Sequence, residues 1–201
     1  MFIHSADLEA ECNWLYNRRF GSKTDKQAKL ERYRELSDAG DSYGQCLLGL
    51  CFYVGWGVSK DDKSAVELYA LSADQGTAWG QYTLGECYYN GDGVSPDRKR
   101  AVELYTLSAD QGNAWGQYKL GECYYNGDGV SSDRKKAVEL YTLSADQDNA
   151  WGQFGLGGCY YNGEGVSANR DLGRQWLKRA ADQRHEIARK WIEFIEYKER
   201  E

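Results

Sequence analysis

The chain has 201 residues and a net charge of −6. This acidic balance, with no run of lysine or arginine, argues against binding nucleic acid or anionic membranes through charge. No stretch approaches the roughly 20 apolar residues that span a bilayer, and the first residues lack the pattern of a secretory signal peptide. We therefore expect a cytoplasmic protein that neither inserts into membranes nor binds nucleic acid.

The N-terminal segment is predicted to cap an array of helices. Residues 6–17 are a weak candidate helix, and residues 26–40 keep a tyrosine and a terminal glycine, Tyr33 and Gly40, that recur later in the chain. Residues 1–40 are therefore assigned to N-terminal capping helices.

The body of the chain repeats itself at an offset of 36 residues. AWGQYTLGECYYNGDGV begins at Ala78, AWGQYKLGECYYNGDGV at Ala114 and AWGQFGLGGCYYNGEGV at Ala150, and the divergent SYGQCLLGLCFYVGWGV begins at Ser42. Each copy is followed by a second segment, such as AVELYTLSADQG from Ala101. Self-similarity at this period indicates a solenoid, in which each unit buries its apolar face only against its neighbours. The predicted repeats, within one structural domain, are 41–76, 77–112, 113–148 and 149–184.

Each repeat is predicted to be a pair of helices. In the first segment Leu84 and Tyr88 recur at helical spacing. Gly80 and Gly85 cost helix propensity there, which is reasonable only where a neighbouring helix approaches closely.

A turn and a cap separate the two helices of a repeat. Asn-Gly-Asp-Gly at residues 90–93 ends the first helix, and Asp97 is suited to cap the N-terminus of the second. Gly112 supplies the C-terminal stop. The predicted inner stripe of the second helix consists of Ala101, Leu104, Tyr105 and Ala109.

The C-terminal segment, residues 185–201, is predicted to be a capping helix. Residues 186–199 are charged, but Ile187, Trp191, Phe194 and Ile195 fall on one side. We expect this side to cover the apolar face of the last repeat, because terminal repeats need a polar outer face. Caps at both ends favour a monomer.

The residues of the repeat resemble a known family. The pattern Ala-x-Gly-Gln-x-x-Leu-Gly-x-x-Tyr-x-x-Gly-x-Gly-Val, followed by Ala-x-x-x-Tyr-x-x-x-Ala-x-x-Gly, occurs four times between about residues 41 and 184 and is similar to the Sel1-like repeat (SLR) family, a relative of the tetratricopeptide repeat. The resemblance implies an all-α, right-handed superhelix of antiparallel helix pairs. It also implies an adaptor that assembles protein complexes. Gly80, Gly116 and Gly152 depart from the alanine that is usual in the family, and Asp148 replaces a terminal glycine.

The related tetratricopeptide architecture implies that the first helices line a concave face. The outward-facing positions of the tetratricopeptide first helix can be transferred to this sequence residue by residue. They then form a row of aromatic side chains with carboxylates and amides between them, which we assign as the partner-binding surface. The assigned residues are Trp79, Tyr82, Glu86, Tyr89 and Asn90, then Trp115, Tyr118, Glu122, Tyr125 and Asn126, then Trp151, Phe154, Tyr161 and Asn162. Trp and Tyr anchor many binding surfaces, so a peptide or a partner domain is the expected ligand.

Two other interpretations of these rings stay open. They could simply pack on one another between repeats, since a solenoid repeats its core residues too. They could also stack on a sugar or another small ligand. A third possibility for the whole chain is an immunity-type regulator that neutralises one specific enzyme.

The sequence gives little support for catalysis or for a bound cofactor. Five of the six cysteines, including Cys87, Cys123 and Cys159, lie in the repeats and are interpreted as small core residues. Equivalent positions one repeat apart lie roughly 10 Å from each other, too far to share a zinc ion. The two histidines, His4 and His185, lie near the chain ends, and no catalytic triad or phosphate-binding loop is evident. We expect no enzymatic activity, no cofactor and no metal.

Overall fold

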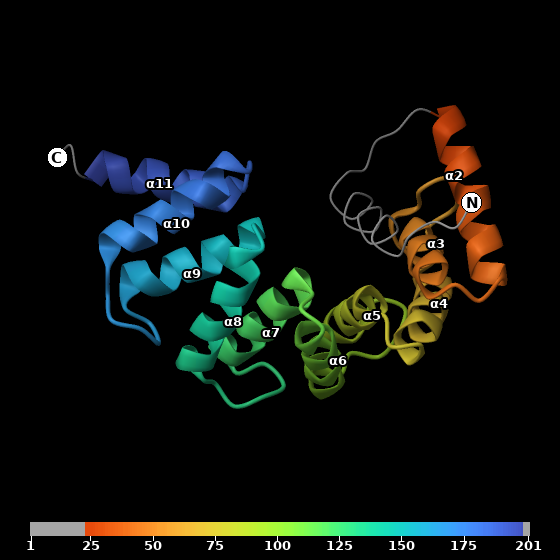
Figure 1. Cartoon of the computed structure of the whole chain (residues 1–201), viewed down its shortest axis with the longest axis horizontal. Coiled ribbons are helices and arrows are strands. Elements are labelled where there is room, and N and C mark those ends of the chain that lie inside the picture. Colours follow the sequence, from red (N-terminus) through yellow and green to blue (C-terminus); the bar gives the residue numbers. More distant parts are fainter. Residues whose placement is uncertain (1–22, 199–201) are drawn as a thin grey trace. The chain divides into compact units, whose positions relative to one another are not determined.

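The computed structural model describes residues 23–198, which form helices and contain no strand (Figure 1). The helices are α2 (Lys23–Asp38), α3 (Ser42–Val54), α4 (Asp62–Asp74), α5 (Ala78–Asn90), α6 (Arg98–Asp110), α7 (Ala114–Asn126), α8 (Arg134–Asp146), α9 (Ala150–Asn162), α10 (Arg170–Asp182) and α11 (Glu186–Lys198). The all-α fold of consecutive helix pairs is thereby confirmed. The candidate helix at residues 6–17 lies outside the described part of the chain.

The chain divides into two compact units between Ser108 and Ala109, within α6. We call residues 1–108 the N-terminal unit and residues 109–201 the C-terminal unit. In the N-terminal unit α3 contacts α2, α4 and α5, and α4 contacts α5. In the C-terminal unit α7 contacts α8 and α9, and α8, α9 and α10 each contact the helix that follows. Helices that follow one another therefore pack side by side in each unit. The expectation of one structural domain stays a prediction.

The turn between paired helices has the predicted geometry. Gly91 adopts the left-handed conformation at φ +83°, and its N–H donates to the carbonyl of Cys87 at 2.8 Å. The N–H of Asp97 donates to the carbonyl of Tyr88 at 2.8 Å, and the Asp97 carboxylate accepts from the N–H of Arg100 at 3.0 Å. The backbone of Asp97 therefore closes the loop, and its side chain caps the N-terminus of α6. The predicted role of Asp97 as N-cap is confirmed.

The second glycine of each loop has a further role. Gly93 (φ +69°) and Gly165 (φ +73°) adopt the left-handed conformation, and a Cβ on either would overlap a carbonyl oxygen of the preceding second helix. The overlapping oxygen belongs to Asp62 at 2.3 Å for Gly93 and to Arg134 at 2.2 Å for Gly165. The loop of one repeat thus rests against the start of the second helix of the repeat before it.

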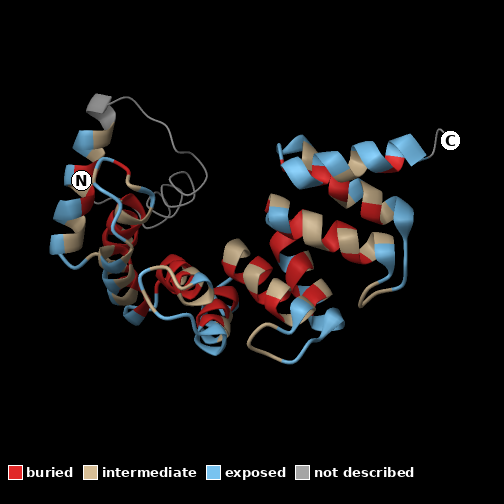
Figure 2. Ribbon diagram, turned by 180° about the vertical axis from the view of Figure 1, so that it is seen from behind, coloured by how far each residue is buried: buried red, intermediate tan, exposed pale blue. Residues whose placement is uncertain are grey.

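Small residues bring the helices together, and the buried sides of the helices face one another (Figure 2). A Cβ on Gly85 of α5 would lie 2.7 Å from the ring of Tyr105 on α6, and one on Gly80 would overlap Oγ of Ser72 on α4. The predicted close approach at these glycines is confirmed, because no larger side chain fits without moving a helix.

The core of the C-terminal unit is built from the repeated apolar positions. Its buried members are Tyr118, Ala137, Tyr141, Ala145, Leu156 and Cys159. All five cysteines of the described chain, from Cys46 to Cys159, are buried, which confirms their assignment as small core residues. Cys12 lies outside the described residues.

Polar side chains link successive repeats. Nε2 of Gln147 donates to Oε1 of Gln117 at 2.7 Å. The Tyr125 hydroxyl donates to the carboxylate of Glu164 one repeat on, where Arg134 also pairs with that carboxylate. The guanidinium of Arg134 in turn stacks on the Tyr125 ring, 3.8 Å from its centroid. This Tyr–Glu–Arg group holds the loop of one repeat to its predecessor.

Removing the Tyr125 hydroxyl is expected to weaken this link. The substitution Tyr125→Phe should lower the free energy of unfolding by about 1 kcal/mol, since the lost bond ends on a charged group that is partly solvated. Tyr161→Phe is the matched control, because the Tyr161 hydroxyl has no hydrogen bond among the described residues. It should change stability by less than about 0.5 kcal/mol. Urea denaturation measures both, and equal effects would show that the hydroxyl does not link the repeats.

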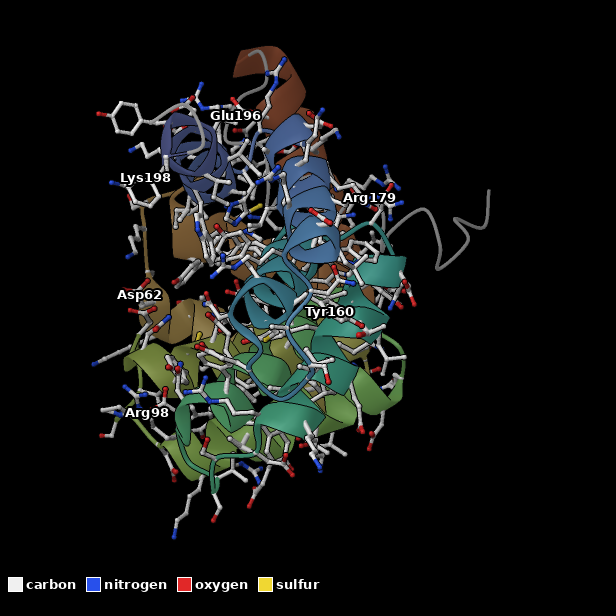
Figure 3. All side chains as sticks on the ribbon, turned by 90° about the vertical axis from the view of Figure 1, so that its left-hand side faces the viewer. Asp62, Arg98, Tyr160, Arg179, Glu196 and Lys198 are labelled. Atoms are coloured by element: carbon white, nitrogen blue, oxygen red, sulfur yellow. The ribbon has the colours of Figure 1, made fainter. Side chains whose placement is uncertain are left out.

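Helix α11 covers the last repeat with fewer residues than expected. Ile195 is buried and Trp191 is half-buried, but Ile187 (52% exposed) and Phe194 (57% exposed) face away from the repeat. The prediction that Ile187 and Phe194 help to cover the last repeat is therefore wrong. Continuing the 36-residue offset explains this, because α11 is a fifth copy of the first helix: Ala188 stands at the position of Gly152. In the other copies a second helix packs on one side of the first helix, and the described chain has no such helix after α11. Charged side chains of α10 and α11, among them Arg179, Glu196 and Lys198, are exposed (Figure 3).

His185 caps α11 from a buried position. Its Nδ1 accepts from the N–H of Ala188 at 3.2 Å, and its ring lies between those of Trp151 and Phe154, at centroid distances of 4.3 and 4.8 Å. Burial lowers the pKa of His185 below its usual 6.5. Asn113 and Asn149 hold the equivalent cap positions in the preceding copies.

Stability of the C-terminal unit is expected to depend on this histidine below neutral pH. As the pH falls below 6.5, the unfolded chain binds a proton at His185 that the folded chain resists, so stability falls until the lowered folded pKa is passed. The substitution His185→Asn keeps a cap and removes the titration. The melting temperature of the wild type should therefore fall more between pH 7 and pH 5 than that of the variant. Equal falls would contradict the assignment, and His4 is common to both proteins.

Candidate functional site

The C-terminal unit contains a pocket of about 240 Å³ between α7, α9 and α11. The first helices α7 and α9 supply most of its lining, α8 contributes one ring and α11 contributes another. The lining residues are Tyr118, Glu122, Tyr125, Asn126, Tyr141, Phe154, Gly155, Gly158, Cys159, Asn162 and Trp191. Six of the residues assigned from the sequence therefore meet at one place: Tyr118, Glu122, Tyr125, Asn126, Phe154 and Asn162.

Two glycines of α9 provide the space for this pocket. Where α7 carries Lys119 and Glu122, the next copy carries Gly155 and Gly158. A Cβ on Gly155 would lie only 3.0 Å from the ring of Tyr141. The side chains that fill this space in the preceding copy are missing from α9, so the pocket follows from a local departure from the repeat.

Trp191 of the capping helix forms one wall of the pocket. Its ring meets those of Phe154 and Tyr161 in edge-on contacts, with centroid distances of 5.8 and 5.9 Å. A Cβ on Gly158 would lie 3.3 Å from Trp191. A glutamate at this position, as on α7, would compete with the indole for the same space.

The lining of the pocket contains one charged side chain, a carboxylate. Glu122 is the one carboxylate among the lining residues, and its Oε2 lies 3.3 Å from Nζ of Lys119 outside the lining. Burial raises the pKa of the Tyr141 phenol, and the nearby Glu122 charge raises it further. Burial likewise raises the pKa of the Cys159 thiol to about 11, with a contribution from Glu164. Cys159 is therefore a protonated thiol at neutral pH and a poor nucleophile.

Some of the assigned aromatic side chains belong to the core. Trp79 (2% exposed), Tyr82 (0%) and Tyr118 (5%) are buried. The Tyr118 ring packs against Tyr141 and against Trp151 of the next repeat, at centroid distances of 6.1 and 5.7 Å. Trp79 and Tyr82 are therefore core residues, and Tyr118 follows the alternative of packing between repeats while also lining the pocket.

The other assigned residues differ in accessibility. Trp115 is half-buried, whereas Trp151 is 37% exposed. The penultimate tyrosines of α5, α7 and α9 each carry an arginine: Arg98 on Tyr89, Arg134 on Tyr125 and Arg170 on Tyr161, at 4.3, 3.8 and 5.7 Å from the ring centroids. Glu86 accepts a hydrogen bond from Tyr105. Asn90, Asn126 and Asn162 are exposed at the ends of their helices.

The sequence analysis missed Tyr141, Gly155 and Trp191 as lining residues. Tyr141 lies on a second helix and was assigned to the core, where it does contribute. Trp191 could have been found by continuing the 36-residue offset beyond residue 184, which places it on a first helix at the position of Gly155. That alignment pairs the large ring of Trp191 on α11 with a glycine on α9.

The described part of the chain has neither a metal-binding cluster nor a membrane-spanning helix. Within residues 23–198 no group of three or more His, Cys, Asp or Glu side chains is arranged to hold a metal ion. None of the described helices is long and apolar enough to cross a membrane.

Comparisons with known proteins agree with the repeat and the fold. The Sel1 repeat model matches residues 42–77, 80–113, 116–149 and 152–185. A protective antigen of uropathogenic Escherichia coli strains with an SLR fold is 33% identical over 77% of this chain (TM-score 0.70), and a Sel1 repeat protein from Oxalobacter formigenes is 28% identical over 81% (TM-score 0.75). This chain covers 33% and 65% of those two chains, less than two thirds of either. No curated protein matches it. The chain belongs to the Sel1 repeat family.

Proposed function

We propose that this protein is an adaptor that binds a peptide or a partner domain on the face formed by α7, α9 and α11. Members of the family generally serve as scaffolds for protein interactions, which supports this class of function. The main observation behind the proposal is the pocket, because aromatic rings from three first helices, α7, α9 and α11, line it together. Partly exposed aromatic side chains around a recess are typical anchors of protein interfaces.

The size of the pocket supports a protein side chain as its occupant. Pockets for small molecules usually have about 300–1,000 Å³, and this one has about 240 Å³. The exposed amides of Asn126 and Asn162 lie at its rim and can bond to the backbone of a bound segment. A partner segment would thus place one side chain in the recess and its main chain across the asparagines. The recurrence of a buried cysteine at the same position of each repeat supports the expected cytoplasmic location, because disulfide scaffolds usually place their cysteines in pairs.

Affinity capture from the native cell, read by quantitative mass spectrometry, tests this function. The bait proteins are the wild type, the pocket variant Phe154→Ala and the surface control Leu143→Ala, which alters an exposed residue of α8. A partner retained by the wild type and by the control, but lost by the folded pocket variant, is the expected result. Identical partners for all three baits would contradict the proposal.

The same capture separates an adaptor from a regulator of a single enzyme. An immunity protein from Pseudomonas aeruginosa shares the fold with 17% identity and a TM-score of 0.50, which is a likeness of fold alone. One stoichiometric enzyme partner that loses activity when bound would favour regulation. Several partners held together would favour the adaptor.

A further inference from the structure

We infer that the pocket between α7, α9 and α11 binds a cationic side chain, a lysine or an arginine, of the partner. This inference rests on the proposed function and names the chemistry of the occupant. It follows from the rings around the pocket, from the sign of its charge and from its size.

Aromatic rings form a large part of the pocket. Five of its eleven lining residues are aromatic: Tyr118, Tyr125, Tyr141, Phe154 and Trp191. The face of an aromatic ring carries a partial negative charge and attracts a cation within about 6 Å. Several rings around one recess therefore favour a cation that is partly shielded from water.

The same chain already pairs cations with its tyrosines. Arg134 lies over the ring of Tyr125, and Lys136 lies 4.3 Å from the centroid of the Tyr124 ring, to whose hydroxyl its ammonium also donates at 2.7 Å. Both rings belong to the first helix α7, and Tyr125 also lines the pocket. A partner cation in the pocket would make the same kind of contact with the rings that line the recess.

Charge complementarity points in the same direction. The lining contains the carboxylate of Glu122 and no lysine, arginine or histidine. Lys119 contacts Oε2 of Glu122, and a second cation can share a carboxylate because each oxygen accepts more than one hydrogen bond. The amide oxygens of Asn126 and Asn162 add further acceptors at the rim. A neutral apolar side chain would leave these acceptors without a new donor.

The recess fits one long side chain. Its volume of about 240 Å³ is below the range of small-molecule sites. Lysine and arginine place an apolar stem along rings and a charged head beside polar groups, which matches a lining of rings with acceptors at one side.

A titration with single amino-acid derivatives tests the inference without knowledge of the partner. The probes are N-acetyl-lysine N-methylamide, N-acetyl-arginine N-methylamide and the neutral N-acetyl-norleucine N-methylamide, each added at millimolar concentrations to the full ¹⁵N-labelled chain. Proton–nitrogen correlation spectra report on the amides of Gly155 and Gly158 and on the indole N–H of Trp191. The cationic probes should shift these three signals in a saturable way, and norleucine should not.

Two variants complete this experiment. Glu122→Gln should weaken binding of the cationic probes by about tenfold, whereas Glu139→Gln, at an exposed position of α8, should leave it unchanged. Equal shifts with norleucine, or unchanged affinity in Glu122→Gln, would overturn the choice of a cation. A partner captured by the wild type and lost by Phe154→Ala would still support the proposed function after that result. The inference and the proposed function can therefore fail independently.

Discussion

The substitution Gly165→Ala is expected to destabilise the C-terminal unit by about 2–5 kcal/mol. The left-handed backbone at φ +73° costs an alanine about 1–2 kcal/mol. The new Cβ would also lie 2.2 Å from the carbonyl oxygen of Arg134, which is backbone and cannot turn away as a side chain does. Relieving that overlap requires the loop to move off α8, at a cost of about 1–3 kcal/mol.

Gly127→Ala separates the two contributions. Gly127 has a similar φ of +80°, but the nearest atom to its Cβ position, from Ser132, lies 3.5 Å away. This control should therefore lose only the conformational part, about 1–2 kcal/mol. Urea denaturation of both variants measures the difference. Equal losses would mean that the loop does not rest tightly on the preceding repeat.

The substitution Gly158→Glu is expected to abolish binding through the pocket, with a loss of affinity of about 30-fold or more for the captured partner. The new side chain restores the residue that α7 carries as Glu122 and fills the recess between the helices. It must also displace Trp191, whose ring lies 3.3 Å from the Cβ position. The variant should stay helical, since glutamate has a higher helix propensity than glycine.

Gly158→Ala is the matched control for this prediction. One methyl group meets the Trp191 ring at a tight distance that a shift of a few tenths of an ångström relieves, and it leaves most of the recess open. Its affinity for the partner should stay within about threefold of the wild type. Isothermal titration calorimetry with the purified partner measures both variants. Full affinity in Gly158→Glu would remove the pocket from the interface.

The sequence was sufficient for the helices and their ends because these depend on interactions only a few residues apart. Asp97 could be assigned as a cap and Gly91 lies in the turn that ends α5, since each position needs a particular side chain or backbone conformation. The 36-residue offset then extended each assignment to every copy. The contact of Gly165 with α8 could not be predicted in this way, because it joins different repeats.

The site was harder to predict because each helix of a solenoid contacts helices of its own repeat and of the next one, and the sequence does not show which of its faces stays exposed. Trp79 and Tyr82 occupy positions that point outward in the related architecture, yet they are buried here. The sequence does not tell how far a first helix is rotated toward the next copy, and that rotation decides whether a ring is core or surface. The pocket itself depends on two glycines, Gly155 and Gly158, whose effect becomes visible only once Trp191 is placed beside them.

Site-specific photo-crosslinking in the native cell tests the central claim most directly. A photoreactive phenylalanine analogue is placed at Asn126 or Asn162 on the rim of the pocket, and at Leu143 on α8 as the control. The proposed interface predicts that one partner is crosslinked from both rim positions and not from Leu143. Crosslinking of that partner from Leu143 alone would contradict it and would place the interface on the second helices.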